Sequence, residues 1–257
     1  MKIAIIGAGN MGGAIARGMA QGTLVQAKDI CVSNPSDGKL KALQADYPDM
    51  QVTNDNCQAV TGADYVIVAV KPWLMEQVLG SLSLKTDQVL VSVAAGVDFA
   101  KLRSYAGVEM PMFRIVPNTA ITHLQSMTLI AAQGTTPQQN NYLIDLFNEM
   151  GVAMLIPESQ IAATTALTSC GIAFVLKYIQ AAMQAGVEMG IYPAAARRMV
   201  AQSVKGAAEL ILADESAHPS AEIDKVTTPG GLTIKGINEL EHNGFTSAVI
   251  KAMKACL

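Results

Sequence analysis

The chain is poor in the residues that mark several common classes of protein. Aromatic residues make up only 5% of its 257 residues, so the interior has to be built from Ala, Val, Ile, Leu and Met. The four cysteines form no C-x-x-C pair, and the three histidines have no carboxylate or cysteine at a ligand or triad spacing. These absences argue against a metal site, a disulfide framework and nucleophilic hydrolysis. We expect no bound metal and a location in the reducing cytoplasm.

An excess of charge and long apolar runs are missing as well. The net charge is −3 and the Lys and Arg residues are not clustered, which gives no electrostatic reason to expect nucleic acid. No stretch approaches the roughly 18 to 20 apolar residues of a membrane span, and the apolar opening is too short for a signal peptide. We therefore expect a small-molecule substrate, no nucleic acid and no membrane. The apolar share of 51% predicts a homodimer or higher homo-oligomer that covers part of the surface.

What the chain does have is a glycine-rich turn between an apolar strand and a helix. Residues 2–6 form the strand, residues 7–12 read GAGNMG, and helical spacing follows. The first glycine permits a sharp turn, the second lets a pyrophosphate approach the backbone, and the third lets helix and strand pack closely. The helix N-terminus then offers free N–H groups to the phosphates. The pattern predicts dinucleotide binding at Gly7, Gly9, Asn10, Met11 and Gly12.

The rest of the chain divides into an alternating part and a helical part. Apolar runs that alternate with helical segments predict further strands over residues 29–33, 65–70, 88–93, 112–116, 127–132 and 152–156. Beyond Pro157, helical spacing covers residues 164–189, 193–213 and 232–257. We predict an α/β fold: an N-terminal Rossmann-like doubly wound sheet over residues 1–156, followed by an all-α domain over residues 157–257 that serves dimerisation and substrate binding.

The loops at the carboxyl ends of these strands supply the other cofactor candidates. The second strand ends in Ser33-Asn34 rather than in a carboxylate, and Lys39 follows. Such groups favour the 2′-phosphate of NADP, although a simple turn and helix cap at this place is compatible with NAD as well. Lys71 directly follows a buried strand, where a solvated lysine is the alternative interpretation. The full set of these candidates is Ser33, Asn34, Lys39, Ala69, Val70, Lys71, Pro72 and Asn118.

Several motifs together resemble the pyrroline-5-carboxylate reductase family, from residue 1 nearly to the C-terminus. They are GAGNMG at 7–12, AVKP at 69–72, AAGV at 94–97, PNT at 117–119 and, most specifically, VTTPGGLTI at 226–234 followed by NGF at 243–245. The resemblance implies reduction of the cyclic imine pyrroline-5-carboxylate to proline by NADPH, the last step of proline biosynthesis. It also implies that two chains interlock their helices, and that the hydroxyl of Thr233 meets the imine nitrogen.

One segment departs from the family's pattern. The family's usual GLSGSGPAY loop, which receives the substrate carboxylate on backbone amides, reads ALTSCGIAF at 166–174. New β-carbons at Ala166 and Ser169 narrow this anion site, so another imine substrate remains open. By resemblance the substrate residues are Thr168, Ser169, Cys170, Gly171, Gly230, Gly231 and Thr233, with Thr233 as the catalytic one.

Two other functions fit parts of the sequence. The β-hydroxyacid dehydrogenases share the plan of a Rossmann domain plus helices, and use a helical lysine with an asparagine four residues later. Lys177 is suitably placed, but residue 181 is Ala and the Pro-Gly-Gly-x-Thr segment is foreign to that class. The altered loop also permits a non-catalytic NADP-binding paralogue. Turnover of pyrroline-5-carboxylate with NADPH distinguishes all three.

Overall fold

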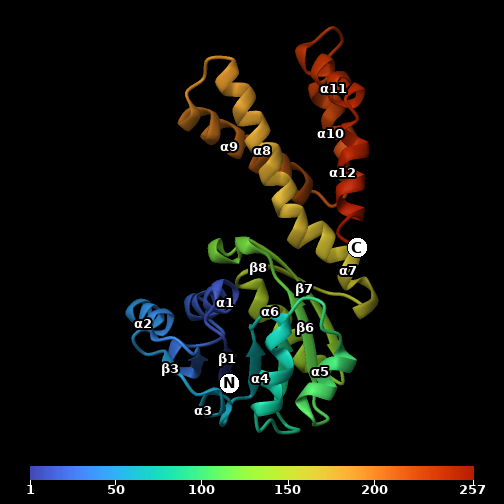
Figure 1. Cartoon of the computed structure of the whole chain (residues 1–257). Coiled ribbons are helices and arrows are strands. Elements are labelled where there is room, and N and C mark those ends of the chain that lie inside the picture. Colours follow the sequence, from blue (N-terminus) through green and yellow to red (C-terminus); the bar gives the residue numbers. More distant parts are fainter. The chain divides into compact units, whose positions relative to one another are not determined.

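A computed structural model describes all of residues 1–257 and divides into two compact units, Met1–Ser169 and Cys170–Leu257. The first unit is a sheet with helices on both faces, and the second is entirely helical (Figure 1). This arrangement confirms the predicted fold class.

The sheet has eight strands in the order β3-β2-β1-β4-β5-β6-β7-β8. All neighbouring pairs are parallel except β6 and β7, which run antiparallel. The order reverses direction beside β1, which is where a doubly wound sheet binds its ligand. The strands are β1 (Ile3–Ile6), β2 (Ile30–Ser33), β3 (Gln51–Thr53), β4 (Tyr65–Val68), β5 (Val89–Ser92), β6 (Met112–Val116), β7 (Ser126–Gln133) and β8 (Gly151–Leu155).

Most helical segments of the first unit connect these strands, and η4 and α7 follow the last strand. The α-helices are α1 (Asn10–Gln21), α2 (Asp37–Asp46), α3 (Asn56–Val60), α4 (Met75–Ser81), α5 (Phe99–Ala106), α6 (Pro137–Asn148) and α7 (Ile161–Thr165). The 3₁₀ turns are η1 (Ala27–Asp29), η2 (Pro72–Leu74), η3 (Thr119–His123) and η4 (Glu158–Gln160). The hairpin from β6 to β7 passes through η3, which is too short to carry the chain back for a parallel pairing. The predicted alternation of strand and helix therefore fails at this one connection.

Side chains of alternate residues in the central strands pack into two hydrophobic cores, one on each face of the sheet. Ile3 and Ile5 of β1 pack with α1, α2 and α6, whereas Ala4 and Ile6 pack with α3, α4 and α5. All four residues are at most 1% exposed. Full burial of an aliphatic side chain stabilises the fold by about 1.5–3 kcal/mol, so the continuous apolar strands hold both helix layers.

The last segment of the first unit is anchored to the sheet by a buried cation. Arg114 lies in β6 and its Nη1 donates to Glu158 Oε1 at 2.5 Å, at the start of η4. The same carboxylate oxygen accepts from the backbone N–H of Phe99 at 2.9 Å. Because a buried guanidinium needs a partner, this pair keeps the chain close to the sheet beyond β8. The first unit consequently runs on to Ser169.

The second unit consists of helices with little buried apolar surface of their own. They are α8 (Gly171–Glu188), α9 (Pro193–Leu212), α10 (Pro219–Val226), α11 (Leu232–His242) and α12 (Phe245–Lys254). Helix α8 packs against α9, where a β-carbon on Gly186 would lie 3.2 Å from that of Ala196. The predicted single helix over residues 232–257 is wrong, because Gly244 adopts φ +75° and separates α11 from α12. Helix α10 was not predicted.

The predicted helix over 164–189 also differs from the structure. It is preceded by α7 and contains a π-helical turn, η5 (Ala166–Cys170), before α8 begins. Residues Glu158–Glu188 together form one helical stretch of 31 residues that is long and apolar enough, by length and composition, to cross a membrane. One stretch therefore reaches the length and mean hydropathy of a membrane span, but a single such helix is weak evidence for a membrane, and polar residues such as Thr168, Ser169 and Lys177 interrupt its apolar run. Only 17% of the most apolar part of this stretch is buried within the chain.

Candidate active site

The glycine turn between β1 and α1 is closed on the side of the sheet and open on the other. Gly7 has φ +101°, and a β-carbon there would lie 2.8 Å from the Ala69 carbonyl oxygen. A β-carbon on Gly12 would lie 1.9 Å from the Gly7 carbonyl oxygen, so this position has to be glycine. Around Gly9, by contrast, no atom lies within 4 Å of where a β-carbon would stand. The backbone at Gly9 is thus open to a ligand.

The N-terminus of α1 is free to bind an anion. Its N-cap is Gly9, whose missing side chain cannot accept from the first N–H groups of the helix, and its first turn has no acidic residue. The unpaired N–H groups and the positive end of the helix dipole therefore face the open side of the turn. This geometry fits the pyrophosphate of a dinucleotide, as predicted for Gly7, Gly9, Asn10, Met11 and Gly12.

The loop after β2 is held by its own side chains. Asn34 is 8% exposed, and its Oδ1 accepts from the backbone N–H of Ala8 at 3.1 Å. Its Nδ2 donates to the carbonyl and hydroxyl oxygens of Ser36 at 3.0 and 2.9 Å. Asn34 therefore ties the glycine turn to the second strand, a positioning role that the sequence did not reveal.

Ser33 is also occupied, by a residue that sequence reasoning missed. The Ser33 side chain is fully buried and its Oγ donates to Asn56 Oδ1 at 2.7 Å, at the first residue of α3. Asn54 Nδ2 donates to the carbonyl oxygen of Asn34 at 3.0 Å and to Asp37 Oδ1 at 2.9 Å. Both asparagines follow β3 at the same edge of the sheet, so sequence reasoning missed them together with that strand.

The remaining candidates of the first half lie on either side of the turn. Lys39 is exposed in the first turns of α2. Ala69 follows β4, donates its N–H to the Ile6 carbonyl oxygen at 2.8 Å and lies against Gly7 and Gly12. Val70, Lys71 and Pro72 continue from it into η2, so the loop after β4 adjoins the glycine turn.

Asn118 connects the cofactor candidates to the first of the substrate candidates. It is 7% exposed at the end of β6, and its N–H donates to Ser126 Oγ at 3.1 Å. Its side chain accepts from the Ala120 N–H at 3.0 Å and donates to the Thr168 carbonyl oxygen at 3.3 Å. The first unit thus brings Asn118 and Thr168 together across 50 residues of sequence.

The substrate candidates Thr168, Ser169 and Cys170 lie in the π-helical turn η5, and Gly171 opens α8. Such turns are rare and occur frequently at functional sites. Burial raises the pKa of the Cys170 thiol, and a hydrogen bond with the side chain of Cys256 raises it further. Both causes disfavour the thiolate, which is the reactive form of a cysteine.

The Pro-Gly-Gly segment forms the predicted turn before α11. Gly230 has φ +72°, and a β-carbon on Gly231 would lie 2.7 Å from the Thr228 hydroxyl oxygen. Gly231 is the N-cap of α11, which leaves the first N–H groups of the helix without a side-chain partner. Thr233 is exposed in this first turn and is not the cap. Its hydroxyl is therefore available to a ligand.

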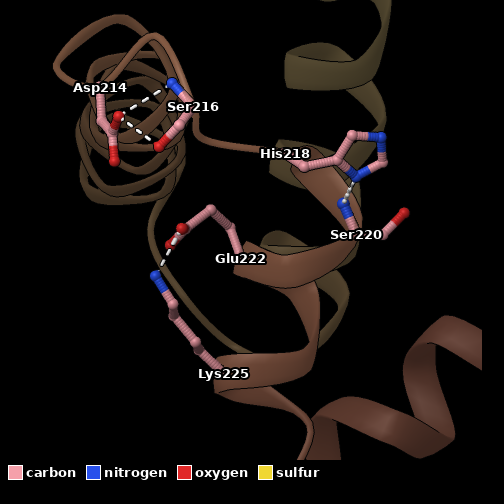
Figure 2. A network of polar contacts seen from close by, with 6 residues as sticks. All are labelled: Asp214, Ser216, His218, Ser220, Glu222 and Lys225. Atoms are coloured by element: carbon pink, nitrogen blue, oxygen red, sulfur yellow. Dashed lines mark hydrogen bonds and ion pairs between the residues drawn. The ribbon is translucent and has the colours of Figure 1, made fainter.

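Polar side chains in the loop between α9 and α10 form hydrogen bonds within that loop and at the start of α10 (Figure 2). The Asp214 carboxylate accepts from the hydroxyl and the N–H of Ser216 at 2.7 and 2.9 Å, bonds that lower the pKa of Asp214. His218 Nδ1 accepts from the Ser220 N–H at 3.2 Å and caps α10. This histidine therefore has a structural role at the start of the helix.

Two family models match the chain. The model described as NADP oxidoreductase, coenzyme F420-dependent, matches residues 2–96. The model described as pyrroline-5-carboxylate reductase dimerisation matches residues 158–257. The first covers the glycine turn and the loops after β2 and β4. The second covers the π-helical turn η5 and all of α8 to α12.

Several curated relatives that share the same protein name match nearly the whole chain. Pyrroline-5-carboxylate reductases 1 and 2 of Dictyostelium discoideum are each 37% identical to it over 98% of its length. The chain spans about half of the first relative (48%) and 89% of the second. The crystal structure of pyrroline carboxylate reductase from Plasmodium falciparum, with NADP bound, is 25% identical and superposes with a TM-score of 0.89. The superposition covers 100% of this chain and 95% of the Plasmodium falciparum chain.

Substitutions of two glycines distinguish the residue that the turn needs for folding from the residue that it needs for ligand binding. Gly12→Ala is expected to lower the free energy of unfolding by about 1–3 kcal/mol, because its β-carbon meets the Gly7 carbonyl oxygen. Gly9→Ala has free space and should keep the melting temperature of the ligand-free protein, yet weaken NADPH binding about tenfold or more. Thermal melts and titration calorimetry measure the two effects. Gly80→Ala in α4 is the control, which should keep the NADPH affinity and not lower the melting temperature. Wild-type NADPH affinity in Gly9→Ala would contradict this placement of the pyrophosphate.

Proposed function

The chain belongs to the pyrroline-5-carboxylate reductase family, and we propose which of its residues carry the reaction. It reduces the cyclic imine pyrroline-5-carboxylate to proline, the last step of proline biosynthesis, with NADP as its cofactor. The observation that supports this function best is the open glycine turn at Gly9, together with an exposed Thr233 directly after the Pro-Gly-Gly segment.

The cofactor is held mainly by backbone groups in this proposal. Gly7 and Gly12 shape the turn, while the N–H groups at the start of α1 receive the pyrophosphate beside Gly9. Bound NADPH supplies the hydride. The loops after β4 and β6, with Lys71 and Asn118, border the same carboxyl edge of the sheet.

The end of β2 explains a preference for NADP over NAD. The side chains of Ser33 and Asn34 already have partners, so they shape the loop and do not repel a 2′-phosphate as a carboxylate would. Asp37, the acidic residue in the first turn of α2, accepts a hydrogen bond from Asn54. Lys39 supplies the nearby positive charge. NAD remains an alternative cofactor.

The substrate is bound by two segments in the proposal. Backbone groups from Thr168 to Gly171, together with Gly230 and Gly231, receive the carboxylate. The Thr233 hydroxyl oxygen accepts a hydrogen bond from the protonated imine nitrogen. This contact favours the iminium, which is a far better hydride acceptor than the neutral imine. Thr233 is therefore the catalytic residue of the proposal.

The helical half is proposed to complete the enzyme by pairing with a second copy. We assign residues 1–156 to cofactor binding and 157–257 to dimerisation and substrate binding. Large apolar side chains of the helices are exposed, among them Leu176 of α8 at 57% and Met199 of α9 at 58%. A helix-rich dimer interface covers such side chains without a membrane. The four unpaired cysteines fit a cytoplasmic location, which we also propose.

Sedimentation tests the pairing of chains. At micromolar concentration we expect a homodimer or larger assembly, and Leu176→Asp should shift it toward monomer because a buried charge is costly. Leu24→Asp, an exposed apolar position of the first unit, is the control and should leave the assembly unchanged. A wild-type monomer at that concentration would count against the proposed dimer.

Thr233 variants test the catalytic assignment. Thr233→Ala should lower kcat about 10- to 100-fold, the equivalent of one hydrogen bond to a charged group, with little change in NADPH affinity. Thr233→Ser keeps the hydroxyl and should keep most of the activity. Measured kcat, NADPH affinity and melting temperature distinguish this role from a scaffold role. A lower melting temperature with unchanged kcat would assign Thr233 to the scaffold alone.

A further inference from the structure

The chain contains one tryptophan, and it is exposed beside the cofactor loop. Trp73 lies in the 3₁₀ turn η2, directly after Lys71-Pro72, and 75% of its surface is accessible. Its neighbour Met75 is fully buried and packs α4 onto the sheet. The indole is therefore not needed for packing within the chain, although large aromatic side chains are usually well buried.

The turn restrains the backbone that carries this indole. Pro72 restricts the backbone at the first position of η2, and the Leu74 N–H donates to the Lys71 carbonyl oxygen at 2.9 Å. The Lys71 ammonium lies 6.0 Å from the centroid of the Trp73 ring, within the range of a cation–π contact. A flat aromatic face and a positive charge thus stand together at the end of β4.

The face of the sheet indicates which part of a dinucleotide lies there. Residues of α3 and α4 belong to the same core cluster and cover the same face, whereas α1 covers the other. On this face α3 begins at Asn56, which binds Ser33 at the end of β2, the strand whose end holds the adenosine ribose in such sheets. Trp73 lies in η2, which leads directly into α4 on that same face.

We propose that Trp73 stacks on the adenine ring of NADP and is an affinity-determining residue of the cofactor site. The proposal rests on the assignment of NADP to the glycine turn. An adenine ring offers a π-face to the indole, and the adjacent Lys71 ammonium suits the negative charge of the phosphates. Stacking of this kind changes affinity about tenfold or more when the aromatic ring is removed.

Because Trp73 is the sole tryptophan, intrinsic fluorescence reports on it alone. Titration of the wild-type protein with 2′,5′-ADP, which has the adenine and no nicotinamide, should quench the emission saturably. Nicotinamide mononucleotide, which lacks the adenine, should leave the emission unchanged. Quenching by the mononucleotide alone would place the indole at the nicotinamide and overturn the proposal, as would the absence of any change with 2′,5′-ADP.

Variants supply a second readout that does not depend on turnover. By titration calorimetry, Trp73→Ala should bind NADPH about tenfold more weakly, whereas Trp73→Phe should stay near wild type. Leu74→Ala, in the same turn, is the control and should not change the affinity. Wild-type affinity in Trp73→Ala would refute the stacking. If the wild-type protein does not bind NADPH at all, the cofactor assignment itself fails, which is a different outcome.

Discussion

The close approach of the glycine turn to the end of β4 is the constraint on which the site depends. Gly7 lies against Ala69, and Gly12 lies against Gly7, at distances that leave no room for β-carbons. This contact sets the direction in which α1 leaves the sheet and turns its N-terminus toward the open side at Gly9. An anion can then be held by backbone N–H groups without any basic side chain in the turn.

Several of the predicted ligand residues also hold this edge of the sheet together. Asn34 connects the turn to the loop after β2, Ser33 connects that loop to Asn56, and Asn118 connects the loop after β6 to Thr168. Each buried hydrogen bond is worth about 0.5–1.5 kcal/mol, but an unpaired buried amide would cost more. These asparagines therefore favour one arrangement of the loops before any ligand is bound.

The fold was largely predictable because the decisive signals are local. The uninterrupted apolar run at 65–68 identifies a strand buried on both faces, and the glycine spacing at 7–12 identifies the turn that follows the first strand. Strand β3 was missed because it has only three residues, two of them polar, at an edge of the sheet. The break at Gly244 was missed because the helical spacing continues through it.

The site was predictable only where a residue contributes its backbone or where a local sequence motif identifies its role. The hydrogen bond from Ala8 to Asn34 joins residues 26 apart, and only the pairing of β1 with β2 places them together. Ser33 and Asn34 at the end of β2 stay predicted cofactor ligands, but their partners Ala8 and Asn56 could not be predicted, because these lie elsewhere in the sequence. The exposure of Trp73 likewise depends on how η2 leaves the sheet.

Transfer of an isotopic label tests the central claim most directly. The protein is incubated with pyrroline-5-carboxylate and NADPH that carries deuterium at both C4 positions of the nicotinamide, and the product is analysed by mass spectrometry. The account predicts proline with one deuterium per molecule, formed in equal amount to the NADPH consumed. Binding of NADPH without formation of labelled proline would contradict it, and would identify the chain as a cofactor-binding protein that does not reduce this imine.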